Sequence, residues 1–410
     1  MLRFRAVVSL IATLGATTLL GAIPSAAQPA SRQVTSATAG CVSQVAPPPP
    51  VDRSEIPAPG RLTPEPVAVP DRPVGGPRMG QCGLILPAGA PAPPLGISST
   101  SWLLADADSG EVIAARDPHA RNRPASTIKV FAALLAVDRL PADRVVVATQ
   151  TDTDQEGSRV GLGPGGSYTV RQLLTGLLLA SGNDAAHALA GQLGGVPQTV
   201  DQMNELAAKL GALDTRTATP SGLDGPGMST SAYDLALAFR QVLSRPLLTE
   251  LLGTRQAAFP GFPGRPGFEL ANDNKLLANY RGALGGKTGF TDDARHTQLD
   301  AAQRGGRRLI VVLMHGEQQP VSMSEQAARL LDYGFALPPG QPVGRLVNEA
   351  PPPETSDADP EPSAGDSALG QNGSGGSPGR SALIPVVFSI GLAAVVLAVL
   401  GALVARQRHR

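Results

Sequence analysis

The run Arg308-Leu-Ile-Val-Val-Leu-Met314 is the clearest strand in a chain region that turns strand-like after Gly286. An earlier strand pair is predicted at 102–113, where Trp102-Leu-Leu-Ala105 and Glu111-Val-Ile113 flank the turn Asp108-Ser-Gly110. Strands at both ends of one region, with helical patterns between them, predict an antiparallel sheet covered by helices. The expected class is α+β, with a mostly helical subdomain.

The helices between these strands are predicted from caps and from 3.6-residue periodicity. One should begin near Ser126, just after Pro124-Ala125, and another at the capping box Thr169-Val-Arg-Gln172. Further helical patterns cover residues 200–210, 231–243 and 324–333. The folded domain is therefore expected at residues 99–340.

Both ends of the chain predict export and a membrane anchor. Arg3 and Arg5 precede an uncharged stretch that ends in small residues at Ala27, which is typical of a secretory signal over residues 1–27. A second uncharged apolar run, 382–405, is long enough to span a bilayer. The arginines in the tail 406–410 place that tail in the cytoplasm and the domain outside.

Two segments rich in proline connect these parts. Residues 28–98 predict a flexible or polyproline spacer, and residues 341–381 predict a disordered stalk before the membrane. Cys41 and Cys82, the two cysteines of the chain, both fall in the first segment. Export permits a disulfide between them, but sequence alone leaves the pairing open.

Charge and composition narrow the possible functions. The chain has 34 basic and 34 acidic residues, so it lacks the electrostatic pattern of a nucleic-acid binder. Four of the basic residues are lysines: Lys129, Lys209, Lys275 and Lys287. Arginine stays protonated in proteins, whereas a buried lysine can become a neutral amine. The lysines that an arginine-rich chain retains are therefore candidates for a chemical role.

Three short motifs occur in order within the domain. They are Ser126-Thr-Ile-Lys129, Ser181-Gly-Asn183 and Lys287-Thr-Gly289, and two of the four lysines lie in them. Each motif alone is weak, whereas together they are a specific indication of acyl-transfer chemistry.

The residue types explain that chemistry. Ser126 and Lys129 share a helix face, and a serine hydroxyl needs a base to remove its proton. Lys129 can serve if burial and the nearby cation Lys287 disfavour its charged form. Ser181 can pass a proton to the leaving group, and Asn183 can hold a substrate amide. The N–H groups of Ser126 and Phe290 can form an oxyanion hole.

These motifs resemble the penicillin-binding serine acyltransferases, most closely the low-molecular-weight D-alanyl-D-alanine carboxypeptidases. The likeness extends through Thr219-Pro-Ser-Gly-Leu-Asp224, 272–277 and 286–291. It implies a β-lactamase/transpeptidase-like fold. It also implies removal of the terminal D-alanine of peptidoglycan stem peptides through an acyl-serine intermediate, with β-lactams as inhibitors.

The resemblance also assigns roles to residues. It implies that Ser126 is the nucleophile and Lys129 its base, and that Thr288 binds the terminal carboxylate. Arg308 is expected to support that carboxylate. Where such proteins usually have glycine after Ala294, this chain has Arg295, so the loop geometry there is open.

No cofactor or metal is expected, because the five histidines lack the spacing of metal ligands. Gly161-Leu-Gly-Pro-Gly-Gly166 fits a dinucleotide fingerprint but is interpreted as a turn before the helix at Thr169.

Two alternatives remain. A β-lactamase would need a deacylating glutamate after the second motif, where Glu205 alone stands before Phe239 and has the pattern of a polar helix face. A membrane-tethered module that binds penicillin or cell-wall peptide without catalysis is the other. Endopeptidase or transpeptidase action on the same bond type also stays open.

Overall fold

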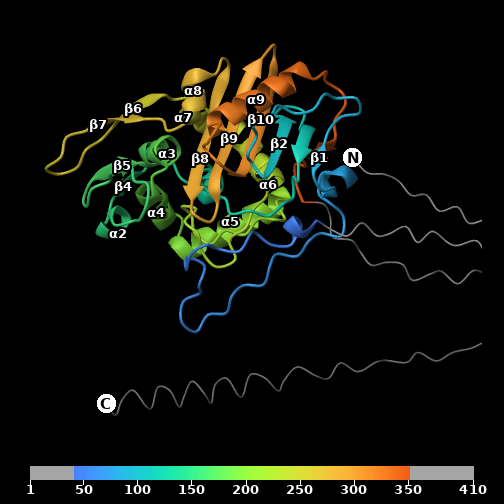
Figure 1. Ribbon diagram of the computed structural model, residues 1–410. Helices are drawn as coiled ribbons and strands as arrows, with labels where there is room; N and C mark the ends of the chain where they lie inside the picture. The colour runs from blue at the N-terminus through green and yellow to red at the C-terminus, as the bar shows by residue number, and fades with distance from the viewer. Residues whose placement is uncertain (1–40, 351–410) are drawn as a thin grey trace, which may run out of the picture. The chain divides into compact units, whose positions relative to one another are not determined.

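The computed structural model describes residues 41–350 (Figure 1). The predicted signal segment 1–27, membrane span 382–405 and tail 406–410 lie outside the described residues, as does most of the predicted stalk. Among the helices at 41–350, none combines the length and the apolar character that a membrane span requires.

An antiparallel sheet, built from strands near both ends of the domain sequence, forms the centre of the domain (Figure 1). Its strand order is β1-β3-β2-β10-β9-β8, and β11 also pairs with β3. The strands from the start of the domain therefore lie beside those from its end, as predicted. The strands are β1 (Leu84–Ile85), β2 (Ser101–Asp106), β3 (Glu111–Arg116), β8 (Ala283–Thr291), β9 (Arg295–Arg304), β10 (Arg307–Gly316) and β11 (Gly344–Arg345).

Strand β10 is buried on both faces, which explains its continuous apolar run. Leu309, Val311 and Leu313 face a core formed with α9 (Met323–Ala336). Ile310 and Val312 face a second, larger core formed with α6 (Ala232–Leu243) and the other helices of the middle region. Alternate side chains of a strand point to opposite faces, so one strand anchors both cores.

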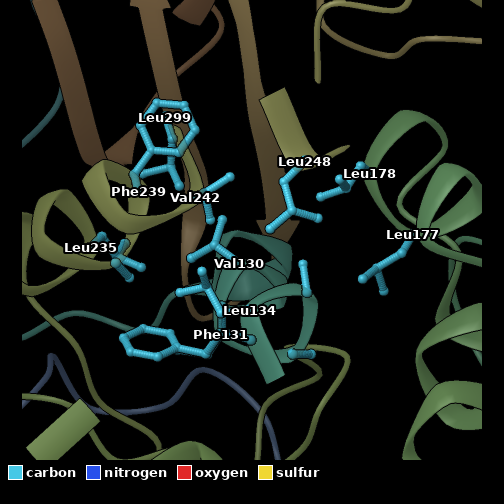
Figure 2. Close-up of a cluster of buried hydrophobic side chains, with 14 of the residues drawn as sticks. Val130, Phe131, Leu134, Leu177, Leu178, Leu235, Phe239, Val242, Leu248 and Leu299 are labelled. Carbon is cyan, nitrogen blue, oxygen red and sulfur yellow. The ribbon is translucent and has the colours of Figure 1, made fainter. Parts of the chain in front are cut away.

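Helix α1 (Lys129–Arg139) lies inside the larger core. Figure 2 shows its Val130, Phe131 and Leu134 among side chains from α6, from α7 (Pro246–Leu252) and from α3 (Val170–Leu179). The remaining helices of this region are α4 (Asn183–Gln192), α5 (Val196–Leu210) and the one-turn α2 (Gln150–Thr153). A helix surrounded in this way holds the residues at its N-terminus in fixed positions.

The predicted start of α3, the end of α5 and the start of α6 agree with the structure, whereas α5 begins four residues before the predicted 200 and α9 runs three residues past the predicted 333. Thr169 accepts a hydrogen bond from the N–H of Gln172, and the Gln172 side chain accepts one from the N–H of Thr169, which completes the capping box of α3. Helix α5 ends at Gly211, whose φ of 79° is left-handed. Ser231 caps α6.

The shorter elements are η1 (Val42–Gln44), η2 (Pro77–Gly80), η3 (Ala125–Ile128), α8 (Lys275–Asn279) and two two-stranded sheets, β4 (Val145–Val147)/β5 (Ser167–Thr169) and β6 (Gln256–Phe259)/β7 (Phe268–Ala271).

Residues 41–85 of the predicted flexible or polyproline spacer at 28–98 are ordered against the domain. Residues 41–85, here called the N-terminal strap, lie on the domain and end in strand β1. Cys41 and Cys82 form a disulfide within the strap. The folded region also extends past the predicted boundary at 340, because β11 joins the sheet.

Arginines of the domain hold the strap in place. The guanidinium of Arg121, which is 1% exposed, donates to the carbonyls of Val45, Val67 and Ala68 and pairs with the buried Asp214. A proline-rich segment has few N–H groups but keeps its carbonyls, and arginine supplies five donors for such acceptors. Composition alone predicted a spacer because it does not reveal these donors.

We expect Arg121→Leu to lower the free energy of unfolding by about 3 kcal/mol, because it leaves strap carbonyls and Asp214 without their buried partner. Urea unfolding measures this loss, and limited proteolysis should show new cleavage within the strap. Arg329→Leu is the matched control, since Arg329 makes only an exposed pair with Glu325 and a bond to Leu95. Equal stability of the two variants would contradict the assigned role of Arg121.

Candidate active site

A cleft of about 380 Å³ lies where β8 meets η3 and the helical region. The residues of the three motifs that line it are Ser126, Ser181, Thr288 and Gly289, together with the adjoining Phe290. The buried Lys129, Asn183 and Lys287 lie behind these residues. The structure thus brings together segments that are more than 150 positions apart in the sequence.

Ser126 and Lys129 are joined by the turn from η3 into α1. Lys129 Nζ lies 2.7 Å from Ser126 Oγ. Ala125, just before the nucleophile, has a φ of 48°, which is uncommon for a residue with a side chain. Gly222 closes this corner, because a Cβ there would lie 2.0 Å from the Ala125 carbonyl oxygen. A larger residue at 222 would displace the nucleophile.

The hydrogen bonds of Lys129 match a neutral amine. Its Nζ lies 2.7 Å from Asn183 Oδ1 and 2.5 Å from the Ser221 carbonyl oxygen, and both oxygens act as acceptors. The Asn183 oxygen is oriented toward Lys129 because Nδ2 donates to the Glu156 carbonyl. A neutral amine donates two hydrogens to these two acceptors and directs its lone pair at the hydroxyl of Ser126.

Electrostatics favour this neutral form. Lys129 is fully buried, and burial together with the positive charge of Lys287 lowers its pKa well below the ordinary value for lysine. Burial also lowers the pKa of Lys287 to about 8, an effect that the carboxylate of Asp273 opposes. The two lysines therefore differ in charge at neutral pH: Lys129 is neutral and available as a base, whereas Lys287 stays cationic.

The second motif lies at the turn between α3 and α4. Ser181 has a φ of 58° and is 5% exposed, so its hydroxyl is held at the cleft in a strained backbone position. The next acidic residue, Asp184, is fully buried and accepts the N–H groups of Val160, Gly161 and Leu162. It fixes the glycine-rich loop that carries Ser158 into the cleft, and it was not among the predicted site residues.

Strand β8 approaches the nucleophile closely at Gly289. A Cβ at this position would lie 2.8 Å from the Ser126 nitrogen and 2.5 Å from Thr297 Oγ1. Only glycine allows this distance. The backbone of β8 therefore runs directly beside the backbone of Ser126.

The structure does not bring Arg308 to this cleft. Arg308 lies at the start of β10, opposite Gln303, and its Nε is 2.9 Å from Asp108 Oδ1. The expectation that it supports the substrate carboxylate is wrong, because the site lies at the other end of the sheet, beside Gly289 and Thr297. Arg295, which replaces the usual glycine, keeps a positive φ of 53° and pairs with Glu317.

Several residues of the cleft were missed by sequence reasoning. They come from the start of α8 and the residue before its cap, from β9, from the loop after β10 and from the start of α9: Asp273, Lys275, His296, Gln298, Gln318, Ser322, Met323 and Ser324. None belongs to the three motifs, although Asp273 and Lys275 lie in the segment 272–277 of the family resemblance, and the rarity of lysine was a further indication for Lys275.

One cluster outside the cleft has the composition of a metal site but not its chemistry. Ligand atoms of His119, Asp214 and Asp234 lie within 4.8 Å of one another. The two ring nitrogens of His119 face Asp214 Oδ2, at 2.6 Å, and the Val74 carbonyl, at 3.0 Å. With both nitrogens engaged and Arg121 also on Asp214, the cluster is an ion-pair anchor for the strap.

A serine nucleophile with a neutral lysine base, a second Ser-x-Asn element and a Lys-Thr-Gly strand define a penicillin-binding type of serine acyltransferase. The comparisons specify the family. The family model for D-alanyl-D-alanine carboxypeptidase matches residues 88–318. The chain belongs to this family of serine peptidases and is a hydrolase.

Individual relatives agree with this assignment. D-alanyl-D-alanine carboxypeptidase DacB2 of Mycobacterium tuberculosis is 48% identical over 266 residues, covering 64% of this chain and 90% of the relative. DacF of Bacillus subtilis is 31% identical, with 58% of this chain and 62% of the relative covered.

Solved structures of this type share the fold. The crystal structure of D-alanyl-D-alanine carboxypeptidase from M. tuberculosis H37Rv superposes with a TM-score of 0.62 at 47% identity and covers 64% of this chain and all of that one. The Streptomyces K15 DD-transpeptidase gives 0.58 at 26% identity, with 60% of this chain and all of that one covered.

We expect kcat/KM to fall as the pH rises through about 8, because Lys287 then loses the positive charge that it holds beside the cleft, while Lys129 stays neutral. A pH–rate profile of the wild type measures this fall in kcat/KM, which is the alkaline limb of the profile. In Lys287→Arg the limb should move to higher pH, since guanidinium stays protonated, although the maximal rate falls. Lys209→Arg, on α5, serves as the control. An alkaline limb near 8 that persists in Lys287→Arg would contradict the assignment.

Proposed function

We propose that this chain removes the terminal D-alanine from peptidoglycan stem peptides that end in D-Ala-D-Ala, and that penicillins acylate the same serine. The observation that carries the proposal is the position of Lys129. Its Nζ lies 2.7 Å from Ser126 Oγ and also contacts Asn183 Oδ1 and the Ser221 carbonyl oxygen, two groups that can only accept hydrogen bonds. This arrangement activates a serine for attack on a carbonyl carbon.

Acylation follows from the geometry. Lys129 takes the hydroxyl proton as Ser126 Oγ bonds to the carbonyl carbon of the penultimate D-alanine. The N–H groups of Ser126 and Phe290 stabilise the oxyanion. The C–N bond then breaks as Ser181 passes its proton to the departing amine of the terminal D-alanine and receives the proton held by Lys129, which returns Lys129 to its neutral form.

Hydrolysis of the acyl-enzyme reverses these transfers. Water adds to the ester carbon as Lys129 accepts one of its protons, and Ser126 leaves with that proton. Neither step needs a cofactor, because a serine, a lysine and backbone N–H groups supply nucleophile, base and oxyanion stabilisation.

The β-lactamase alternative receives less support. Glu205 is exposed on α5 and is not among the residues that line the cleft, where Asp273 is the carboxylate. A deacylating glutamate is thus lacking from the described cleft. Transfer to an amine instead of water would use the same acyl-enzyme, as the name of the K15 DD-transpeptidase illustrates for that protein.

D-alanine release from a peptide ending in D-Ala-D-Ala tests the proposal. We expect Ser126→Ala to lower the rate by about a thousandfold or more, and to abolish the mass adduct with benzylpenicillin, because Ser126 Oγ is the side-chain hydroxyl that lies 2.7 Å from Lys129 Nζ. Ser109→Ala, in the β2–β3 turn, should retain both activities. A wild-type protein that forms the penicillin adduct but releases no D-alanine would contradict the carboxypeptidase function and favour a binding role.

We also propose that the domain lies on the extracytoplasmic side of the cell membrane, anchored by a single pass at 382–405. The apolar runs at both ends and the arginines after residue 405 support this location. The Cys41–Cys82 disulfide supports it independently, because such bonds persist in oxidising compartments.

Removal of residues 382–410 should shift the protein from the membrane fraction to the soluble exported fraction, because the truncated chain loses its apolar run. Cell fractionation with an antibody to the domain measures the shift. A deletion limited to the tail 406–410 is the control and should stay with the membrane. A truncated protein that still sediments with membranes would contradict the proposed anchor.

A further inference from the structure

Three of the four lysines gather at the active-site cleft. Lys129 and Lys287 form its buried centre, and Lys275 lines its wall, while Lys209 lies on α5. The other 30 of the 34 basic residues are arginines. The mechanism above uses the two buried lysines and leaves Lys275 without a role.

The backbone of Lys275 is held firmly although its side chain is exposed. It is the first residue of α8, directly after Asn274, which is 3% exposed. Asn274 Oδ1 accepts the N–H of Leu276 at 3.0 Å, and its Nδ2 donates to Asp300 Oδ1 at 2.6 Å. In contrast, the Lys275 ammonium makes no hydrogen bond or ion pair with the residues described at 41–350. A fixed base thus carries an unengaged charge beside the cleft.

The other charged groups near the cleft are already engaged or neutral. Lys287 Nζ donates to the Thr288 carbonyl at 2.7 Å, and Asp273 acts on Lys287. Burial lowers the pKa of His296, which is therefore neutral at pH 7. Among the described residues that line the cleft, Lys275 is the cation available to a ligand.

The surroundings of Lys275 suit an anion. The Thr288 side chain lies in the same cleft, and Thr288 pairs with Gln298 on the neighbouring strand. Ser322 and Ser324, at the N-terminus of the 14-residue helix α9, line the cleft as well. Helix N-termini carry a partial positive charge, which acts in the same direction as the hydroxyls and the ammonium. Lys275 also borders a second hollow of about 300 Å³ between α8 and α9, where the carboxylates of Glu325 and Asp332 form ion pairs with arginines.

We propose that Lys275 is a specificity residue whose ammonium binds the free α-carboxylate of the substrate's last residue, in the place expected of Arg308. The inference rests on the proposed function, because a carboxypeptidase must read a free carboxylate. Thr288 contributes its hydroxyl to the same group. Lys275 acts on binding and does not take part in proton transfer at Ser126.

Paired substrates test this role in the full-length protein. The peptide ending in D-Ala-D-Ala is compared with its C-terminal amide, which lacks the charge. We expect Lys275→Met to lower the ratio of kcat/KM for acid over amide about tenfold, mainly through KM, and Lys275→Arg to restore most of it. Lys209→Met is the matched control. An unchanged ratio, or equal losses with both substrates, would overturn the proposal.

A second measurement separates this proposal from the proposed function. Benzylpenicillin and its methyl ester differ in whether the carboxylate is free or esterified. Both can be compared by their rates of Ser126 acylation, which does not require D-alanine release. Lys275→Met should lower the acid-to-ester ratio of acylation rate constants about tenfold, even if the wild type releases no D-alanine. If that ratio stays at the wild-type value, Lys275 does not read the carboxylate.

Discussion

The burial of one lysine amine is the constraint on which the active site depends. An isolated charged ammonium is costly to bury, and the protein meets this constraint by favouring the neutral form of Lys129. The surrounding elements are arranged for that purpose. Helix α1 enters the large core, α4 supplies Asn183, and the loop at Ser221 supplies a carbonyl. Each contributes an acceptor or excludes water, so the packing of the helical region and the reactivity of Ser126 have the same cause.

The sheet provides the complementary half of the site. Strand β10 packs both cores together, and β9 and β8 extend from it toward the nucleophile. Because β8 pairs with β9 without interruption from Gly285 to Thr291, Gly289 stays within contact of the Ser126 backbone. The cleft is therefore set by hydrogen-bonded strands on one side and a buried helix on the other, which pre-organises the oxyanion donors before substrate binds.

Much of this arrangement could be predicted from residue patterns. The apolar run of β10, the capping box at Thr169 and the three motifs gave the sheet, the helices and the centre of the site. The strap could not be predicted, since its order comes from guanidinium groups such as that of Arg121, far along the chain. Arg308 was misplaced because spacing along the sequence does not show which end of a strand faces the cleft. Lys275 lay outside every motif.

The strap also contacts the two chain segments that flank the cleft, one just before Ser126 and one just after β8. Arg123, three residues before the nucleophile, forms an ion pair with Glu55 of the strap. Asp293, just beyond β8 and 3% exposed, accepts the Val51 N–H at 2.5 Å. The same strap segment is thus tied to the chain that enters Ser126 and to the chain that leaves Gly289. The Cys41–Cys82 disulfide closes the strap upon itself, which limits its freedom in the unfolded chain and favours this docked position. A segment with the composition of a spacer therefore helps to keep the two walls of the cleft in register.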